Sequence, residues 1–235
     1  MKKVLASLLF LLLLATACHR SVPWSAENEK VWLHRANSIE MAQQYQWQFP
    51  GLEIDLRYID SLQDFLVKHD ADEDSQLTLE QWCEALDNRS NLGIWFDFKN
   101  LTRLNRDGAL QRLSALRDQY QLNGKLYVES SNYWSLRAFQ DAGFLVSFYI
   151  PTFDPETADS TTLAKSRNKI QGAINYGVDA ISGFDYQYDF MKREFPNHRK
   201  LLWTTNSDPE YQSRFIAQAG TDTLVDVLLI PKSNR

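Results

Sequence analysis

The chain has few of the features that mark a disulfide-stapled, zinc-bound or nucleotide-dependent protein. It has two cysteines, Cys18 and Cys83, among 235 residues, and neither belongs to a CxxC pair. It also lacks a GxGxxG or P-loop motif, an internal repeat and a low-complexity tract. Zinc-ribbon and nucleotide-cofactor interpretations therefore have no support. The formal net charge of −5 leaves no broad basic surface, so nucleic acid is not an expected partner.

Long apolar runs are missing as well. The longest covers residues 4–14, which is shorter than the ~20 apolar residues that a membrane-spanning helix needs. It follows Lys2 and Lys3 and precedes small residues, the arrangement of a cleaved export signal. Because the small residues end directly before Cys18, residues 1–17 resemble a bacterial lipoprotein signal peptide, cut before Cys18, which is then acylated. An ordinary cleaved signal peptide is the alternative.

The expected location follows from this signal. Residues 18–29 are polar, contain Pro23, and form the predicted tether between a lipid anchor and the domain. His19 follows the cysteine in place of an Asp, so nothing argues for retention at the inner membrane. We therefore expect an exported lipoprotein of the bacterial cell envelope, attached to the outer membrane and facing the periplasm. With Cys18 acylated, Cys83 has no disulfide partner and is expected to be a small core residue.

Residues 30–235 are expected to form a single domain. Their length suits one sizeable core, and hydrophobic residues make up 44% of the whole chain. Short β-rich runs alternate with amphipathic helical patterns, which indicates βαβ units and a parallel sheet. Eight or nine strand candidates favour a closed (β/α)8 barrel of TIM type, in the α/β class, with any ninth strand irregular or outside the barrel. The strand candidates are residues 31–34, 52–57, 65–69, 92–98, 125–130, 144–150, 178–182, 201–205 and 224–230, and the helix candidates include residues 79–86, 108–120, 134–142, 162–176 and 209–219.

Ionisable residues stand at the ends of four successive strand candidates. His34 ends the first, and His69 ends the third after an apolar run. The second carries Glu53 and Asp55 two residues apart, and hence on one face of the strand. Asp97 ends the fourth. Because the carboxyl ends of barrel strands share one mouth, we expect these side chains to meet there.

Such a set of residues has a coherent chemistry. Three converging carboxylates repel one another unless a cation lies between them, and oxygen ligands of this kind suit one divalent cation, Mg²⁺ or Ca²⁺. Histidines titrate near neutral pH and serve as acid and base, and Lys99 on the face of Asp97 adds a positive contact. Each piece alone is more often structural, such as an ion pair between Asp97 and Lys99. Together they favour a metal-dependent hydrolase of phosphate esters.

The same residues resemble a known group, the phospholipase-C-like phosphodiesterase superfamily, and in particular its glycerophosphodiester phosphodiesterases. The resemblance covers essentially the whole domain and implies a barrel of that type. It implies that His34 and His69 are the catalytic acid/base pair, and that Glu53, Asp55 and Asp97 bind the metal. The motifs, in order, are His34-Arg35-Ala36, Glu53-Ile54-Asp55, His69-Asp70, Asp97-Phe98-Lys99 and Trp203-Thr204-Thr205-Asn206. The residues expected to contact substrate are Arg35, Lys99, Glu129, Trp203 and Asn206.

Two departures from the glycerophosphodiester pattern leave the substrate class open. Asp97 stands where those enzymes usually have Glu, and its Asp-x-Lys form is similar to that of sphingomyelinase D. Residues 77–86 supply one helix between His69 and the strand of Asp97, so the insertion typical of glycerophosphodiester enzymes is not expected. The expected substrate is a phospholipid head group or a glycerophosphodiester. Glu129 ends the next strand, as a fourth ligand or as a partner of Lys99.

The closest local resemblance is to the menorin family, which is related to the same barrel. Residues 32–38 are similar to its W-x-H-x-x-N-S start, and residues 93–99 are similar to its G-I-x-x-D-F-K segment. Asp74, Leu77 and Trp82 match its D-x-x-L…W pattern. Animal members of that family look like extracellular interaction proteins. A non-catalytic envelope binding protein is therefore the alternative to a phosphodiesterase.

A third interpretation concerns residues 70–81, which resemble a calcium-binding EF-hand loop. Ser75 replaces its turn glycine, and Gln81 replaces its bidentate glutamate. The run before Asp70 also indicates a strand where an EF-hand has a helix. We interpret this acidic segment as a solvated loop at the barrel mouth.

Overall fold

The computed structural model describes residues 29–232 of the chain. The predicted signal peptide, Cys18 and all of the predicted tether except Glu29 lie outside the described residues. Within residues 29–232, no helix is both long and apolar enough to cross a bilayer. Cys83 is free and fully buried, which confirms its prediction as a core residue, and burial raises the pKa of its thiol to about 12.

Eight parallel strands close into a barrel, which confirms the predicted TIM-type α/β fold. Their hydrogen-bonded order is β1-β9-β8-β7-β6-β5-β4-β2, and β1 pairs with β2 through Leu33 and Leu52 to close the ring. The short β1 is held on its other side by β9, with Val31 opposite Leu228. The barrel strands are β1 (Val31–Leu33), β2 (Gly51–Ile59), β4 (Gly93–Phe98), β5 (Leu126–Ser130), β6 (Leu145–Tyr149), β7 (Ala180–Phe184), β8 (Arg199–Trp203) and β9 (Val225–Ile230).

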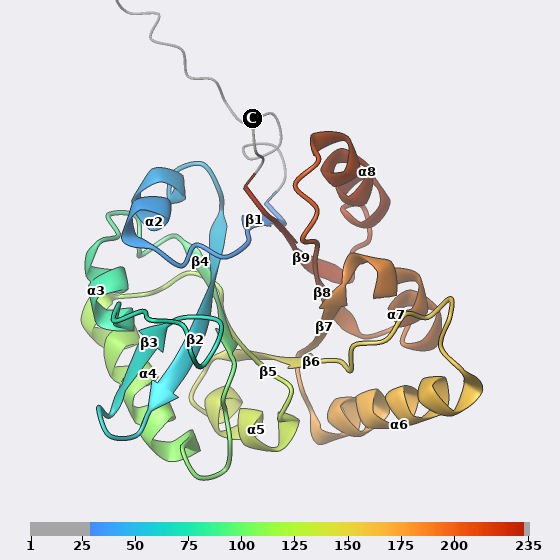
Figure 1. Ribbon diagram of the computed structural model, residues 1–235, viewed down its shortest axis with the longest axis horizontal. Helices are drawn as coiled ribbons and strands as arrows, with labels where there is room; N and C mark the ends of the chain where they lie inside the picture. The colour runs from blue at the N-terminus through green and yellow to red at the C-terminus, as the bar shows by residue number, and fades with distance from the viewer. Residues whose placement is uncertain (1–28, 233–235) are drawn as a thin grey trace, which may run out of the picture.

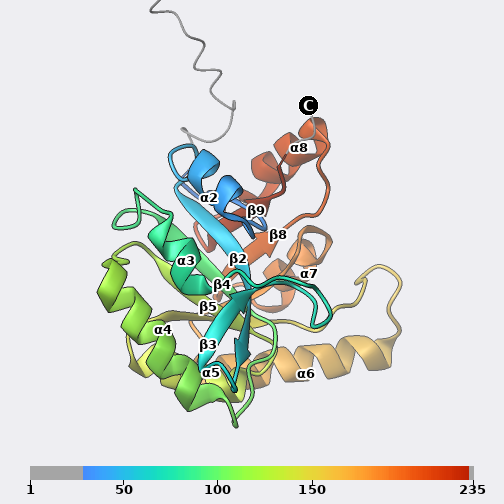
Figure 2. The ribbon, with the colours of Figure 1, turned by 60° about the vertical axis from the view of Figure 1, so that its left-hand side comes forward.

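The ninth strand, β3 (Asp64–Val67), lies outside the barrel. It pairs antiparallel with the far half of β2, with Leu56 opposite Val67. Both views show it beside α3 (Leu79–Glu84) and α4 (Arg106–Tyr120) (Figure 1, Figure 2). The prediction that this strand ends at the mouth in parallel with its neighbours is therefore wrong. β3 begins beyond the mouth and runs back toward it, so His69 enters the site from a loop.

Helices follow one another around the outside of the strands (Figure 1). Four of them begin at a side chain that accepts a hydrogen bond from the third helical amide, namely Ser38, Thr78, Asp159 and Asp208. Such caps satisfy amides that the first turn leaves unpaired, so the helices start where the sequence places them. The remaining elements are α2 (Ile39–Tyr45), α5 (Tyr133–Asp141), α6 (Ser160–Tyr176), a 3-10 turn η1 (Asp185–Gln187), α7 (Tyr188–Glu194) and α8 (Pro209–Ala219).

The hydrophobic core has one part between strands and helices and a second part inside the barrel. At the amino-terminal end of the strands, the Trp32 ring occupies space that two glycines leave open. A Cβ atom on Gly51 would lie 2.2 Å from that ring, and one on Gly93 would lie 2.4 Å from it. Trp32 also meets Tyr127 edge-on, with ring centroids 6.2 Å apart. We call these four residues the floor of the barrel. They pack the barrel interior near this end, opposite the carboxyl ends of the strands.

Candidate functional site

A pocket of about 110 Å³ opens at the carboxyl ends of the barrel strands. Most of the residues predicted from the sequence line it, although they come from segments far apart in the chain. Those residues are His34, Arg35, Glu53, His69, Asp97, Lys99, Glu129 and Trp203. Trp95, Tyr149, Phe184, Thr205 and Leu229 line it as well.

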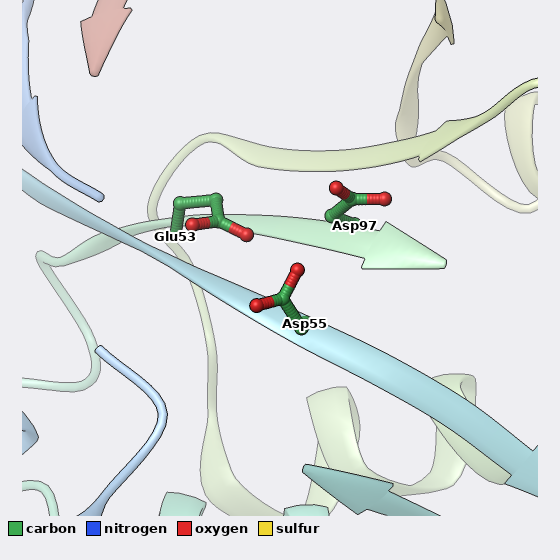
Figure 3. Close-up of side chains that lie close together, drawn as sticks. All are labelled: Glu53, Asp55 and Asp97. Atoms are coloured by element: carbon green, nitrogen blue, oxygen red, sulfur yellow. The ribbon is translucent and has the colours of Figure 1, made fainter. Parts of the chain in front are cut away.

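Three carboxylates converge beside this pocket. Glu53 and Asp55 extend from β2 and Asp97 extends from the adjacent β4, and their side chains lie close together (Figure 3). One oxygen atom from each lies within 4.8 Å of the others. The register explains the meeting, because Asp55 pairs directly with Asp97 and Glu53 lies two residues earlier on the same face.

Glu53 is buried, at 1% exposure, as is Asp55. Its Oε2 atom accepts a hydrogen bond of 2.6 Å from the Arg35 amide, whereas Oε1 is buried without a hydrogen-bond partner. Burial, together with the charges of Asp55 and Asp97, raises the pKa of Glu53 well above its ordinary value. A carboxylate kept in such surroundings needs a cation nearby.

Lys99 supplies one positive charge to the other two acids. Its Nζ atom lies 2.8 Å from Asp55 Oδ1 and also donates to Asp97 Oδ2. Burial alone would raise the pKa of Asp55, but the Lys99 charge and the hydrogen bonds from Lys99 and Asn37 outweigh burial and lower it. For Asp97, burial outweighs the attraction of Lys99, so its pKa is raised. One lysine therefore leaves the three acids only partly neutralised.

His34 follows β1 and is held in one tautomer. Its Nδ1 atom lies 3.1 Å from the Thr204 carbonyl oxygen, which can only accept, so Nδ1 carries the hydrogen. The unprotonated Nε2 atom then lies on the side of the acids, 3.8 Å from Glu53 Oε2. Burial, followed by the charge of Arg35, lowers the pKa of His34 to about 4. The ring is neutral near pH 7 and presents a lone pair at the pocket.

His69 reaches the pocket from the loop after β3. Its carbonyl oxygen accepts from Arg57 Nε at 2.9 Å, and the Lys68 amide donates to the Asp55 carbonyl at 3.0 Å, which attaches the loop to β2. The His69 Nδ1 atom lies 2.8 Å from Asp70 Oδ1. The acidic residues 70–74 are exposed, as predicted for a solvated loop.

The segment after His34 positions both the histidine and the acids. Arg35 has a φ of 58°, a left-handed conformation that turns its amide onto Glu53. Asn37 donates to Asp55 Oδ2 at 2.6 Å and accepts from the Asp55 amide at 2.9 Å. The Trp82 indole of α3 donates to the Ala36 carbonyl at 2.8 Å. Asn37 and Trp82 thus have positioning contacts, although neither was among the predicted site residues.

Asn206 is placed differently from the other predicted residues. It does not line the pocket, and its side-chain oxygen accepts from the Asp208 amide at 2.9 Å within the turn before α8. Trp203, the first residue of the same motif, does line the pocket and packs edge-on against Trp95. The Thr204 carbonyl in between holds His34. A backbone contact of this kind leaves no signal in the sequence.

The donor set fits a divalent cation. Three carboxylates present oxygen ligands within reach of a common point, and one of them has a buried, unpartnered oxygen. Such oxygens suit a hard cation like Mg²⁺ or Ca²⁺.

Comparison with known proteins gives structural relatives only. No protein-family model and no curated protein sequence matches the chain significantly. A glycerophosphodiester phosphodiesterase from Parabacteroides distasonis superposes with a TM-score of 0.61 at 17% identity, covering 86% of this chain and 92% of that one. A second such enzyme from that species gives 0.54 at 14% identity, covering 88% and 83%. A phosphodiesterase from Oleispira antarctica, solved with the product sn-glycerol-3-phosphate, gives 0.59 at 13% identity, covering 86% and 92%.

The fold is therefore that of glycerophosphodiester phosphodiesterase structures. At these identities the likeness concerns the barrel and does not extend to the reaction. The resemblance to the menorin family stays a prediction, and so do the roles of individual site residues.

Proposed function

We propose that this chain is a metal-dependent phosphodiesterase. The observation that carries the proposal is the convergence of Glu53, Asp55 and Asp97 within 4.8 Å, with an unpartnered Glu53 oxygen beside a neutral His34. The three acids would hold one Mg²⁺ or Ca²⁺ ion. When bound, such an ion neutralises phosphoryl oxygens and orients the ester for displacement.

The two histidines take the proton-transfer roles in this proposal. His34 presents an unprotonated Nε2 atom, which is suited to attack phosphorus or to accept a proton, while Thr204 fixes the opposite side of its ring. His69, paired with Asp70, would serve as the second acid or base. Arg35, Lys99, Glu129, Trp203 and Asn206 are the proposed substrate contacts, of which Asn206 would have to leave its turn.

The proposed substrate is a phospholipid head group or a glycerophosphodiester. The structurally similar Oleispira antarctica enzyme binds sn-glycerol-3-phosphate as its product, which supports a phosphodiester in the same kind of barrel.

Activity on a panel of glycerophosphodiesters and lysophospholipids tests the proposal. We expect turnover with Mg²⁺ or Ca²⁺, loss of turnover with EDTA, and a loss of at least ~1,000-fold in kcat for His34→Ala, on the scale of removing an acid/base group and its contacts. His198→Ala is the matched control, because His198 lies in the turn before β8 at the other end of the barrel. No turnover on any ester with either ion would overturn the proposal.

The competing proposal is a non-catalytic envelope binding protein. It is favoured by Lys99, whose Nζ atom bridges Asp55 and Asp97 and so gives these acids a partner without a metal. Absence of turnover, combined with failure of Mg²⁺ and Ca²⁺ to raise the melting temperature, would support it. Metal-dependent turnover would exclude it.

We further propose export to the bacterial envelope with acylation at Cys18. Cells grown with labelled palmitate should incorporate label into the wild-type chain and should not do so for Cys18→Ser. Fractionation should place the wild-type chain with the outer membrane. If the wild-type chain and Cys18→Ser are both released into the periplasm in soluble form, an ordinary signal peptide is favoured.

A further inference from the structure

Aromatic side chains form part of the pocket lining. They are Trp95, Tyr149, Phe184 and Trp203, from β4, β6, β7 and β8. Trp203 is the centre of this group, with its ring centroid 6.0 Å from Trp95, 4.9 Å from Tyr149 and 5.1 Å from Phe184. We call these four residues the aromatic wall. Aromatic faces attract organic cations through the ring quadrupole.

A fourth carboxyl group also lines the pocket, because Glu129 pairs with Asp97 across β4 and β5. Glu129 of β5 lines the pocket at 1% exposure, and its Oε2 atom is buried without a hydrogen-bond partner. Among residues 29–232, it takes part in no ion pair, and Lys99 is already shared between Asp55 and Asp97. Glu129 thus brings a buried carboxyl group that no ion pair of the described residues balances.

Glu129 has one ionisable strand neighbour, Asp97 across β4 and β5, and its other polar neighbours are uncharged. Ser147 pairs with it across β5 and β6, and the hydroxyls of Ser147 and Ser182 and the Trp95 indole N–H are buried without partners. These groups supply dipoles that favour an ionised carboxylate, but they supply no positive charge. Burial, together with the charge of Asp97, raises the pKa of Glu129 well above its ordinary value, so a bound cation would stabilise its ionised form.

We propose that Glu129 and the aromatic wall bind a quaternary ammonium group of the substrate. A neutral polyol would be better matched by several donors and acceptors than by rings, and an anion would be repelled by Glu129 and Asp97. A trimethylammonium group matches both features, because its methyls pack on rings while its charge faces the carboxylate. This inference rests on the proposed function and narrows the substrate to choline-type phosphodiesters.

Binding of choline tests the subsite without requiring turnover. Quenching of tryptophan fluorescence or calorimetric titration should detect choline binding to the wild-type chain. The uncharged isostere 3,3-dimethylbutanol should bind about 10- to 100-fold more weakly, the range of a desolvated cation–π contact. Glu129→Gln and Tyr149→Leu should each weaken choline binding about 10-fold or more. Glu84→Gln, an exposed acid on α3, is the charge-matched control and should leave binding unchanged.

Turnover supplies the second measurement. A choline phosphodiester should be cleaved with a kcat/KM about 10- to 100-fold above that of its 3,3-dimethylbutyl analogue, and Glu129→Gln should bring this ratio close to one. Both the choline ester and its 3,3-dimethylbutyl analogue are assayed in two forms, one esterified to a short soluble alcohol and one to an acyl-bearing alcohol that forms micelles. Comparing the two forms distinguishes a free diester from a lipid as the source of the head group. Glu129→Gln should bind Mg²⁺ as tightly as the wild type does. If Glu129 were a fourth metal ligand, the substitution would instead weaken Mg²⁺ binding.

Two results would separate the two proposals. Turnover with equal kcat/KM for the charged and neutral esters would overturn the ammonium subsite and leave the phosphodiesterase standing. Choline binding that depends on Glu129, in a chain without any turnover, would overturn the phosphodiesterase and leave the subsite. Equal binding of choline and its isostere to the wild-type chain would likewise overturn the subsite.

Discussion

The two ends of the barrel interior are built on opposite principles. At the floor, the Trp32 ring fits against Gly51 and Gly93 so closely that no Cβ atom has room. At the mouth, buried oxygens of Glu53 and Glu129 have no hydrogen-bond partner. Polar atoms left in this state destabilise a fold, and tight apolar packing stabilises one. The comparison indicates that the floor maintains the barrel while the mouth is arranged for a ligand.

Removing a charge from the mouth has the largest expected effect on function. Glu53→Gln keeps an oxygen for the Arg35 amide but removes a buried charge from between two other acids. We expect kcat/KM to fall about 1,000-fold, equivalent to ~4 kcal/mol, because one metal ligand is lost. The free energy of unfolding without metal should rise by ~1–2 kcal/mol, since a buried charge has been removed. Urea unfolding and ester turnover measure the two effects.

The effect of metal ions on stability gives a second test of the role of Glu53. Mg²⁺ or Ca²⁺ at many times its Kd should raise the melting temperature of the wild-type chain and leave that of Glu53→Gln nearly unchanged, because only a site that binds the ion is stabilised by it. A Glu53→Gln chain that is both inactive and less stable than the wild type would contradict the assignment of the mouth to ligand binding.

At the floor, the expected effect is on stability. Gly51→Ala places a Cβ atom 2.2 Å from the Trp32 ring, which is rigid and enclosed, so strands must shift. We expect the free energy of unfolding to fall by ~3 kcal/mol, the upper range for overpacking a core. Gly172→Ala on α6 is the control, since its Cβ would lie 3.3 Å from the terminal oxygen of Tyr133 and alanine favours helix. Equal urea midpoints for the two variants would show that the floor is not closely packed.

Most of the architecture could be predicted because its signals are local. A parallel strand buried on both faces is a short apolar run, and residues two apart share a face, so Glu53, Asp55 and Asp97 could be placed together. The direction of β3 was missed, although a signal was present. Only residues 60–63 connect β2 to β3, and a parallel crossover needs a dozen residues or more.

Other features of the site depend on contacts that residue types do not reveal. His34 is oriented by the carbonyl of Thr204, and Glu53 is held by the amide of Arg35, and any residue at those two positions has a carbonyl and, proline apart, an amide. The aromatic wall lay within reach of the same-face rule, since Tyr149, Phe184 and Trp203 each end a barrel strand. Only Trp203 was identified, because it is a defining residue of a recognised motif, whereas Trp95 stands at a variable position of the G-I-x-x-D-F-K segment.

The β2–β3 hairpin extends past the mouth, and it carries His69 although it lies outside the barrel. Arg112 of α4 donates to Asp64 of β3 through two nitrogens, at 2.8 and 2.9 Å, and to Glu80 of α3 at 2.7 Å. The hydrogen bond from Arg112, followed by one from Gln119, lowers the pKa of Glu80 below 4.5. This ion-pair network is the connection of the hairpin to two helices.

Breaking that network has the smallest expected effect. Arg112→Met keeps the aliphatic stem and should cost ~1 kcal/mol of unfolding free energy at pH 7, a value reduced for partial exposure. Because the folded pKa of Glu80 is depressed, its share is complete above pH 4.5 and is lost as the pH falls through the folded pKa, so the wild type and Arg112→Met should converge in acid. Urea midpoints at pH 7 and near pH 3 measure this.

Arg167→Met breaks a comparable pair with Glu194 far from the hairpin, and it should leave phosphodiester turnover unchanged. Arg112→Met should lower turnover a few-fold, because a looser hairpin positions His69 less well. If both variants reduce turnover equally, the hairpin is not what positions that histidine.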